Sequence, residues 1–140
     1  SGDMFNVLRM ALQIQRMIDN KPFADAHKPI ESLSIAPSQA LEWATINGAQ
    51  MMGMEHKIGS LTPGKQADII LIRSDDLNLR PVNDPVNAVV FYANASNIDS
   101  VYIAGELKKK NGHLIYTNLS TIMEKLEVSG ARILANSNAA

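Results

Sequence analysis

The sequence contains no cysteine in its 140 residues. Disulfide bonds, thiolate catalysis and zinc sites with cysteine ligands are therefore excluded. The absence of cysteine also agrees with a reducing compartment, and we expect a cytoplasmic protein. Long apolar runs are missing as well. None approaches the roughly 20 residues that a membrane-spanning helix needs, so we expect no membrane partner.

A surplus of charge of either sign is also absent. Lysine and arginine number 13 and aspartate and glutamate 14, which gives a formal net charge of −1. Nucleic acids and anionic membranes attract strongly basic proteins, so this balance argues against both as partners. The one basic run, residues 108–110, has no interleaved aromatic side chains. We expect it to be a solvated hairpin tip that keeps an edge strand from pairing.

Metal-binding motifs are missing too. His27, His56 and His113 are the only histidines. They form neither a His-x-His nor a His-x-x-x-His pair, and we expect them to be surface or turn residues. The adjacent carboxylates Asp75 and Asp76 lie in a polar segment, where solvation is the expected role.

One segment partly matches the phosphate-binding loop motif, but we interpret it as a false match. Residues 59–65 match the pattern G-x-x-x-x-G-K, but Gln66 stands where that motif has serine or threonine. Pro63 also removes a backbone N–H, and the segment leads into a strand pattern rather than a helix. The sequence therefore predicts no catalytic, cofactor-binding or metal-binding residue in this chain, and no cofactor of its own.

The hydrophobic content of 46% is typical of a globular protein, and the first part of the chain has helical periodicity. Residues 3–20 are predicted to be a helix that Asp3 caps and Pro22 ends, with an apolar arc that packs against a sheet. Its polar stripe comprises Asn6, Arg9, Gln13, Arg16 and Asn20. A loop over residues 21–36 and a helix over residues 37–52 follow, with Pro37 at its first position and Gly53 at its end. Met51 and Met52 are expected in the core.

The second part of the chain has strand patterns. Residues 58–72 are predicted to be strand, tight turn and strand, with Pro63-Gly64 at the centre of a type II turn. The apolar run 69–72 predicts a strand that is covered on both faces. Further predicted elements are a short helix or turn over residues 84–92, a turn at 94–97, a strand at 98–104, a hairpin of 107–110 with 113–116 around Asn111-Gly112, a helix at 118–135 and a frayed tail at 136–140.

These patterns indicate an α+β fold. We place the boundary near residues 54–56, so that residues 1–55 form a helical part and residues 56–140 a β-rich part with a C-terminal helix. The chain starts Ser-Gly-Asp-Met-Phe without an initiator methionine. We expect either a purification remnant before the first native residue or a piece of a longer protein.

Residues 44–49 (Ala-Thr-Ile-Asn-Gly-Ala) and residues 59–72 (Gly-Ser-Leu-Thr-Pro-Gly-Lys-Gln-Ala-Asp-Ile-Ile-Leu-Ile) carry a family resemblance. Together they resemble the C-terminal signature of the metal-dependent amidohydrolase superfamily. Residues 97–105 with Asn111-Gly112 are similar to the last strands of that superfamily. Residues 3–12 resemble the helix after the eighth barrel strand in its cytosine-deaminase-like and chlorohydrolase-like branch.

The resemblance implies a TIM barrel beside a small composite β-sandwich, and a metal-bound water that attacks a non-peptide C–N bond or a halogenated ring carbon. It also implies that this chain is the C-terminal portion: the last barrel helices and the C-terminal half of the sandwich. The family's His-x-His pair is absent, and its metal-binding aspartate would lie just upstream of Ser1. We interpret Asp3 as a helix cap near that site rather than as the ligand.

The expected complete protein is a deaminase or amidohydrolase that uses a divalent metal, zinc or iron, and a small-molecule substrate. The present chain alone is expected to be inactive. A stand-alone, non-enzymatic interaction or self-association module is the alternative. In either case we expect exposed strand edges and apolar faces to promote self-association.

Overall fold

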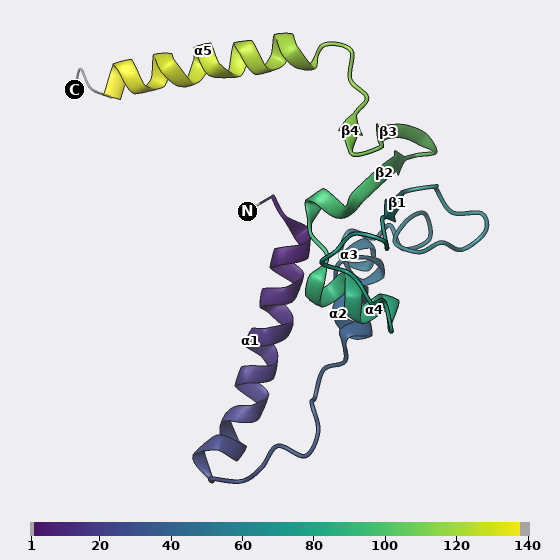
Figure 1. The fold of residues 1–140 in the computed structure, drawn as a ribbon, viewed down its shortest axis with the longest axis vertical. Helices are drawn as coiled ribbons and strands as arrows, with labels where there is room; N and C mark the ends of the chain where they lie inside the picture. Colours follow the sequence, from purple (N-terminus) through teal and green to yellow (C-terminus); the bar gives the residue numbers. More distant parts are fainter. Residues whose placement is uncertain (1, 138–140) are drawn as a thin grey trace.

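The computed structural model describes residues 2–137. It has an α+β fold, as predicted, with helices and a four-stranded antiparallel sheet (Figure 1). The elements are α1 (Met4–Asp25), α2 (Pro37–Trp43), α3 (Ile46–Met51), β1 (Ile69–Ile72), α4 (Pro85–Asn87), the π-helix η1 (Ala88–Tyr92), the 3₁₀-helix η2 (Ala95–Asn97), β2 (Ile98–Ile103), β3 (Glu106–Lys110), β4 (His113–Leu114) and α5 (Leu119–Ser137).

Helix α1 begins as the sequence predicts but ends later. The Asp3 carboxylate accepts hydrogen bonds from the backbone N–H groups of Phe5 (3.1 Å) and Asn6 (3.4 Å), which confirms the cap. The prediction that Pro22 ends the helix is wrong, because α1 continues to Asp25. Proline lacks an N–H but keeps its carbonyl, and the Pro22 oxygen accepts from Ala26 N at 3.1 Å. In the last turn the proline therefore removes one hydrogen bond without stopping the helix.

The single helix predicted over residues 37–52 is two helices, α2 and α3. They are separated at Thr45, whose backbone has φ −128° and ψ −98° and whose hydroxyl donates to the Leu41 carbonyl at 2.8 Å. Pro37 is the first residue of α2, as predicted. Gly53, with φ +67°, ends α3 in a Schellman arrangement. Its N–H bonds the Gln50 carbonyl, and the next N–H bonds the Ala49 carbonyl, both at 2.9 Å.

Residues 58–72 contain the predicted turn but only one strand. Gly64 has φ +94°, and the Lys65 N–H bonds the Thr62 carbonyl at 3.1 Å, which confirms a turn centred on residues 63–64. The strand predicted before the turn is wrong. Gly59 has φ +86° there and lies directly against α3, where a Cβ atom would be 2.7 Å from the Cβ of Ala49. This close packing, rather than strand pairing, fixes the segment.

The sheet has the order β1-β2-β3-β4. Two two-residue turns connect its last three strands, at Ala104-Gly105 and at Asn111-Gly112, and all four residues have positive φ, as type I′ hairpins require. The hairpin at Asn111-Gly112 was predicted, although β4 spans only two residues instead of 113–116. The prediction that residues 69–72 are covered on both faces is wrong. β1 is an edge strand, and Ile70 and Leu71 are 55% and 47% exposed.

The core lies between α1, α2 and the segment that contains α4 and η1. Leu8 and Leu12 of α1 pack with Ala40 of α2 and Val90 of η1, and all four are buried. The helix or turn predicted for residues 84–92 is confirmed, and Asp84 caps it by accepting from the Asn87 N–H at 3.0 Å. In the described residues α1 packs mainly on the helical elements α2 and η1, so the packing of its apolar arc against a sheet stays a prediction.

Replacing Leu12 with alanine should therefore destabilise the chain by about 3 kcal/mol. Its side chain is fully buried, so truncation removes apolar burial and leaves a cavity. The urea midpoint, followed by the fluorescence of Trp43 in the neighbouring helix α2, measures the effect. Leu77→Ala is the control, because Leu77 is 92% exposed and its truncation should change stability by less than about 0.5 kcal/mol. Equal effects of the two substitutions would contradict this core assignment.

Large apolar side chains also remain on the surface. The outer side of α1 exposes Met4, Val7, Met10, Ile14, Met17 and Ile18, each by 46–66%. Met51 and Met52 are 87% and 60% exposed, so the prediction that they fill the core is wrong. A helix that is apolar on two sides is typical of one that is packed between two layers. Here one of those layers is α2 and η1.

Helix α5 confirms the helix predicted over residues 118–135 and extends it to Ser137. Gly130 lies inside the helix. The predicted frayed tail is helical at residues 136–137, and residues 138–140 lie outside the described part. α5 extends away from the sheet (Figure 1) and contains no buried residue. Across residues 2–137, every helix is too short or too polar to cross a membrane.

Candidate functional site

The three histidines are dispersed in the structure. His27 follows α1 with φ +53°, His56 lies in the loop after α3, and His113 lies in β4. All three are exposed, as expected for surface or turn residues. In the described residues, no group of three or more histidine, cysteine, aspartate or glutamate side chains is arranged to hold a metal ion.

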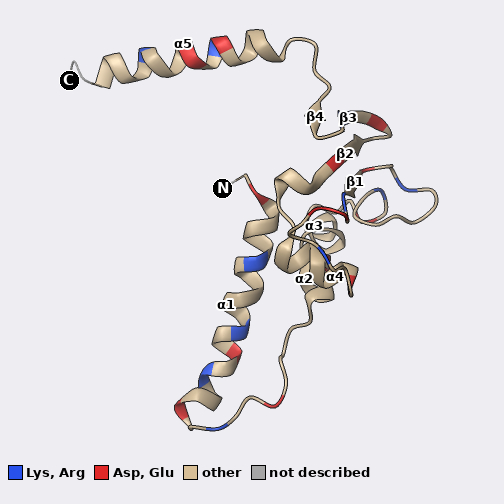
Figure 2. Ribbon diagram, viewed as in Figure 1, with Lys and Arg blue, Asp and Glu red and all other residues tan. Residues whose placement is uncertain are grey.

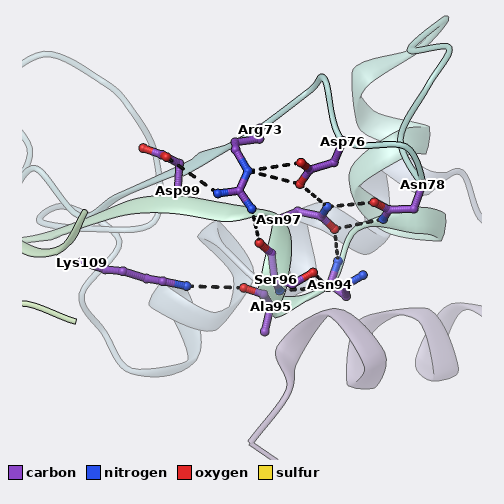
Figure 3. A network of polar contacts seen from close by, with 9 residues as sticks. All are labelled: Arg73, Asp76, Asn78, Asn94, Ala95, Ser96, Asn97, Asp99 and Lys109. Carbon is purple, nitrogen blue, oxygen red and sulfur yellow. Dashed lines mark hydrogen bonds and ion pairs between the residues drawn. The ribbon is translucent and has the colours of Figure 1, made fainter. Parts of the chain in front are cut away.

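The most developed polar arrangement centres on Asn97, the last residue of η2, directly before β2 (Figure 3). Asn97 is 1% exposed. Its amide nitrogen donates to Asp76 Oδ2 (2.7 Å) and to Asn78 Oδ1 (2.9 Å). Its amide oxygen accepts from Asn78 Nδ2 (3.0 Å) and from the Asn94 N–H (2.9 Å). We call Asn97, Asp76, Asn78, Asn94 and Arg73 the Asn97 cluster.

Arg73 connects the Asn97 cluster to the sheet. Its Nε lies 3.3 Å from both carboxylate oxygens of Asp76, and its Nη2 donates to the Ser96 carbonyl at 2.6 Å. Its Nη1 is 4.0 Å from Asp99 Oδ1 in β2. The Asn97 hydrogen bond, followed by the Arg73 contact, lowers the pKa of Asp76 below its usual value. Asp76 is thus half-buried and paired, and the prediction that it is merely solvated is wrong, whereas Asp75 is exposed.

A second carboxylate, Asp68, links residues 65–68 to the β2–β3 turn. Asp68 Oδ1 accepts from the Ala104 N–H at 2.7 Å and from Gln66 Nε2 at 3.1 Å. The Gly105 N–H also donates to the Ala67 carbonyl at 2.9 Å. The backbone hydrogen bond from Ala104 is the main cause that lowers the pKa of Asp68. The Ala67-Asp68 pair therefore holds a hairpin more than 30 residues further along the chain.

Because Asp68 and Asp76 have lowered pKa values, we expect the fold to lose stability in acid. Each has a folded-state pKa below its unfolded value, so its contribution is complete above the unfolded pKa, about 3.9, and is lost as the pH falls through the folded pKa. We expect the urea midpoint to be constant from pH 7 to about 5 and to drop below about pH 4. The double variant Asp68→Asn, Asp76→Asn should have a shallower drop. An identical pH profile for the variant would contradict the assignment.

Two arginines of the predicted polar stripe attach α1 to the loop before α2 and to η1. Arg9 Nε and Nη2 donate to the carbonyls of Val90 (3.2 Å) and Ala93 (2.8 Å) at the end of η1. Arg16 donates twice to the Ile35 carbonyl, and its guanidinium lies 5.8 Å from the ring centre of Phe91. These residues satisfy backbone carbonyls rather than face solvent. Figure 2 shows positive and negative residues interspersed along α1, without segregation of either sign.

The basic run at residues 108–110 was predicted to be a hairpin tip. It lies instead along β3, before that tip. Lys108 pairs with Glu106, and Lys109 donates to the Ala95 carbonyl at 3.4 Å. The prediction that the run keeps an edge strand from pairing is wrong, because β3 pairs with β2 on one side and with β4 on the other.

A shallow hollow lies beside the Asn97 cluster. It is lined by Asn78, Leu79, Arg80, Pro81, Asn83, Asp84, Asn87, Ala88 and Tyr92. Three of its six polar side chains are amides, and the Asp84 carboxylate already caps α4. Amides fix orientation through hydrogen bonds but supply neither a strong base nor a nucleophile near neutral pH. The arrangement joins the sheet to the helices, and we assign it no chemical step.

Sequence reasoning missed the Asn97 cluster. Residues 94–97 were predicted to be a turn, which η2 confirms, but nothing in that pattern indicated a buried asparagine. The available signal was the number of asparagine and aspartate residues at positions 76, 78, 94 and 97, because such side chains can satisfy one another only when distant segments meet.

Solved structures share this fold. An adenosine deaminase from Xanthomonas campestris with bound zinc has a TM-score of 0.80 and 25% identity, covering 94% of this chain and 28% of that one. Atrazine chlorohydrolase from Arthrobacter aurescens TC1, complexed with zinc, has a TM-score of 0.72 at 21% identity, covering 89% of this chain and 25% of that one. The second likeness is one of fold alone.

Similar sequences extend the comparison. A 5-methylthioadenosine/S-adenosylhomocysteine deaminase of Teredinibacter turnerae is 38% identical over 115 residues, which cover 81% of this chain and 24% of that protein. A deaminase of the same name from Acetivibrio thermocellus is 46% identical over 80 residues, which cover 57% of this chain and 19% of that protein. The chain thus spans about a quarter or less of the length of these relatives. The sequence model of the amidohydrolase family matches residues 1–108, and the chain therefore belongs to the amidohydrolase family.

Proposed function

We propose that this chain is a structural part of a longer metal-dependent hydrolase that deaminates an adenosine-like nucleoside, that is, one that breaks a non-peptide C–N bond. The observation that carries the proposal is the 38% identity, over 81% of the chain, to a protein named as a 5-methylthioadenosine/S-adenosylhomocysteine deaminase. The small share of that relative's length that is matched, 24%, supports a piece of a larger protein.

The metal of the complete protein would be a divalent ion, zinc or iron, which activates a water molecule for attack on the ring carbon that bears the amino group. The bound zinc of the similar adenosine deaminase supports this part of the proposal. The residues present here do not fit such a site, because within residues 2–137 no cluster of metal ligands is assembled. We therefore place the ligands in polypeptide outside these 140 residues and assign no catalytic residue to this chain.

The proposed division of the chain into two structural parts follows the family architecture. Residues 1–55 would be terminal helices of a TIM barrel, and residues 56–140 the C-terminal half of a β-sandwich followed by a helix. Two observations support this division. α1 is apolar on the side that faces α2 and also on its outer side. β1 is an apolar edge strand that could pair with a further strand. The segment that forms α4 and η1 belongs to residues 56–140, but it packs on α1 and α2 of residues 1–55 and so joins the two parts.

Expression of two polypeptides tests the proposal: the 140-residue chain and the complete product of its reading frame. Ammonia release from 5′-methylthioadenosine, S-adenosylhomocysteine and adenosine measures turnover, and elemental analysis measures bound metal. We expect turnover and a bound divalent metal in the complete product only. Turnover by the 140-residue chain would contradict the proposed structural role. Absence of turnover by a metal-loaded complete product would contradict the deaminase assignment.

A stand-alone module that self-associates is the second candidate, and the exposed apolar side chains of α1 and β1 favour it. Light scattering of the 140-residue chain and the length of its reading frame discriminate between the two candidates. A reading frame that starts at residue 1, with a discrete oligomer in solution, would favour the module. A longer reading frame, with aggregation of the isolated chain, would favour the hydrolase part.

A further inference from the structure

The turn at Asn111-Gly112 forms the tip of the β3–β4 hairpin, and both of its residues are exposed. Asn111 has φ +49° and Gly112 has φ +78°. In the described part of the chain, a Cβ atom at Gly112 would have one neighbour within 4 Å, the Arg73 Nη1 atom at 3.8 Å. The side-chain amide of Asn111 is therefore open to water, and the glycine after it has no side chain to shield its backbone nitrogen.

An asparagine that precedes glycine can lose its amide group without an enzyme. The backbone nitrogen of Gly112 gives up its proton and bonds to Cγ of Asn111. The bond from Cγ to the amide nitrogen then breaks, and ammonia leaves with that proton, so that a succinimide ring remains. Water opens the ring at one of two C–N bonds. Breaking the bond at Cγ gives aspartate, whereas breaking the bond at the backbone carbonyl carbon gives isoaspartate, whose main chain runs through Cγ.

A second asparagine-glycine pair, Asn47-Gly48, has a different environment. It lies within helix α3, and Asn47 is half-buried. Gly59 packs directly on this helix, with its Cβ position 2.7 Å from the Cβ of Ala49, and the Ala49 N–H bonds the Thr45 carbonyl at 3.1 Å. Ring closure needs rotation of the backbone at the asparagine, which would disrupt this packed helix. The structure therefore distinguishes two pairs that the dipeptide pattern treats alike.

One hydrogen bond holds the Gly112 nitrogen in place. Its N–H donates to the Asp99 carbonyl of β2 at 2.9 Å, so the nitrogen must leave this carbonyl before it can attack. Strand β4 spans only His113–Leu114, and such short pairings are marginally stable. Opening of the hairpin frees the nitrogen, and the positive charge of Arg73 beside it favours the loss of its proton.

We propose that Asn111 is a site of spontaneous deamidation, that separation of β4 from β3 limits its rate, and that isoaspartate at this position keeps the two strands apart. The two-residue loop, with positive φ at both positions, fixes the register of the hairpin. Isoaspartate adds a carbon atom to the backbone of that loop, so that Lys110 and His113 can no longer stay paired. The modification thus weakens the β4 edge of the sheet irreversibly.

The conversion of the two asparagines, measured in the complete product of the reading frame, tests the proposal. Peptide mass spectrometry after incubation near neutral pH detects the loss of the amide, and chromatography separates aspartate from isoaspartate. In the folded protein we expect Asn111 to convert at least about tenfold faster than Asn47, whereas in urea the two should convert at similar rates. Conversion of Asn47 as fast as Asn111 in the folded protein, or of Asn111 only in urea, would overturn the inference.

Ile115→Pro tests whether opening of the hairpin limits the rate. The Ile115 N–H bonds the Lys108 carbonyl at 2.9 Å, and proline cannot form this bond. Asn111 should then convert at least about threefold faster. Thr117→Pro is the matched control, because Thr117 is exposed, lies after β4 and donates no backbone hydrogen bond in the described part of the chain. Equal rates in the two variants would show that pairing of β4 does not control the reaction.

Hydrogen exchange of the Ile115 N–H measures the consequence for the sheet. In the isoaspartate form we expect this exchange to be at least about tenfold faster than in the unmodified protein. Asn111→Asp is the control, since it adds the same charge without lengthening the backbone, and aspartate before glycine also suits a type I′ turn. Its exchange should match that of the unmodified protein. Unchanged exchange in the isoaspartate form would contradict the proposed separation of the strands.

Discussion

Replacing Asn97 with leucine should destabilise the fold by about 4 kcal/mol, because several polar groups lose their partner at once. The Asn78 amide, the Asp76 carboxylate and the Asn94 N–H all bond the Asn97 side chain. A polar group that is left without a partner costs about 1–3 kcal/mol, and solvent can reach some of these groups. Urea denaturation followed by circular dichroism and by Trp43 fluorescence measures the loss.

Two further substitutions make the Asn97 prediction specific. Asn83→Ala is the control, since Asn83 is exposed beside the same hollow, and its effect should stay within about 0.5 kcal/mol. Asn97→Asp keeps the shape but places a second carboxylate 2.7 Å from Asp76 Oδ2. Like charges at this distance raise one of the two pKa values, so the defect should be partly relieved in acid. If Asn97→Asp were as stable as the original at pH 7, the cluster would not have the contacts described.

Substitution of Gly59 by alanine should cost about 4 kcal/mol, for two reasons that add. At φ +86° any side chain is strained, by about 1–2 kcal/mol. The new Cβ would also lie 2.7 Å from the Cβ of Ala49 and 3.0 Å from the Cα of Ile46, so that helix α3 must move. Forcing extra atoms into a packed site costs about 1–3 kcal/mol more. The measurement is again the free energy of unfolding in urea.

Gly53→Ala separates these two reasons. Gly53 has a similar positive φ of +67°, but nothing lies within 4 Å of the position that a Cβ would take. Its substitution should therefore show only the backbone strain, about 1 kcal/mol. Equal losses for the two glycines would mean that Gly59 does not pack on α3. A loss at Gly59 well above that at Gly53 would establish the close approach as the role of this glycine in the signature segment.

The sequence by itself determined the features that depend on neighbouring residues. The Asp3 cap, Pro37 at the start of α2, the turn at Pro63-Gly64 and the hairpin at Asn111-Gly112 each follow from local backbone chemistry, and the structure confirms them. The family also followed from sequence, because residues 44–49 and 59–72 carry a specific signature. Such features need no knowledge of distant segments.

Only the tertiary structure decided the features that depend on distant segments. Pro22 remains within α1, and residues 58–62 pack on α3 instead of forming a strand. Asn97 is buried because segments around residues 76, 78 and 94 converge on it, and no local pattern specifies that convergence. Hydrophobic periodicity identifies which faces are apolar but not what covers them. For that reason the apolar arc of α1 was recognised from sequence, while the exposure of its outer side in this chain became visible only in the fold.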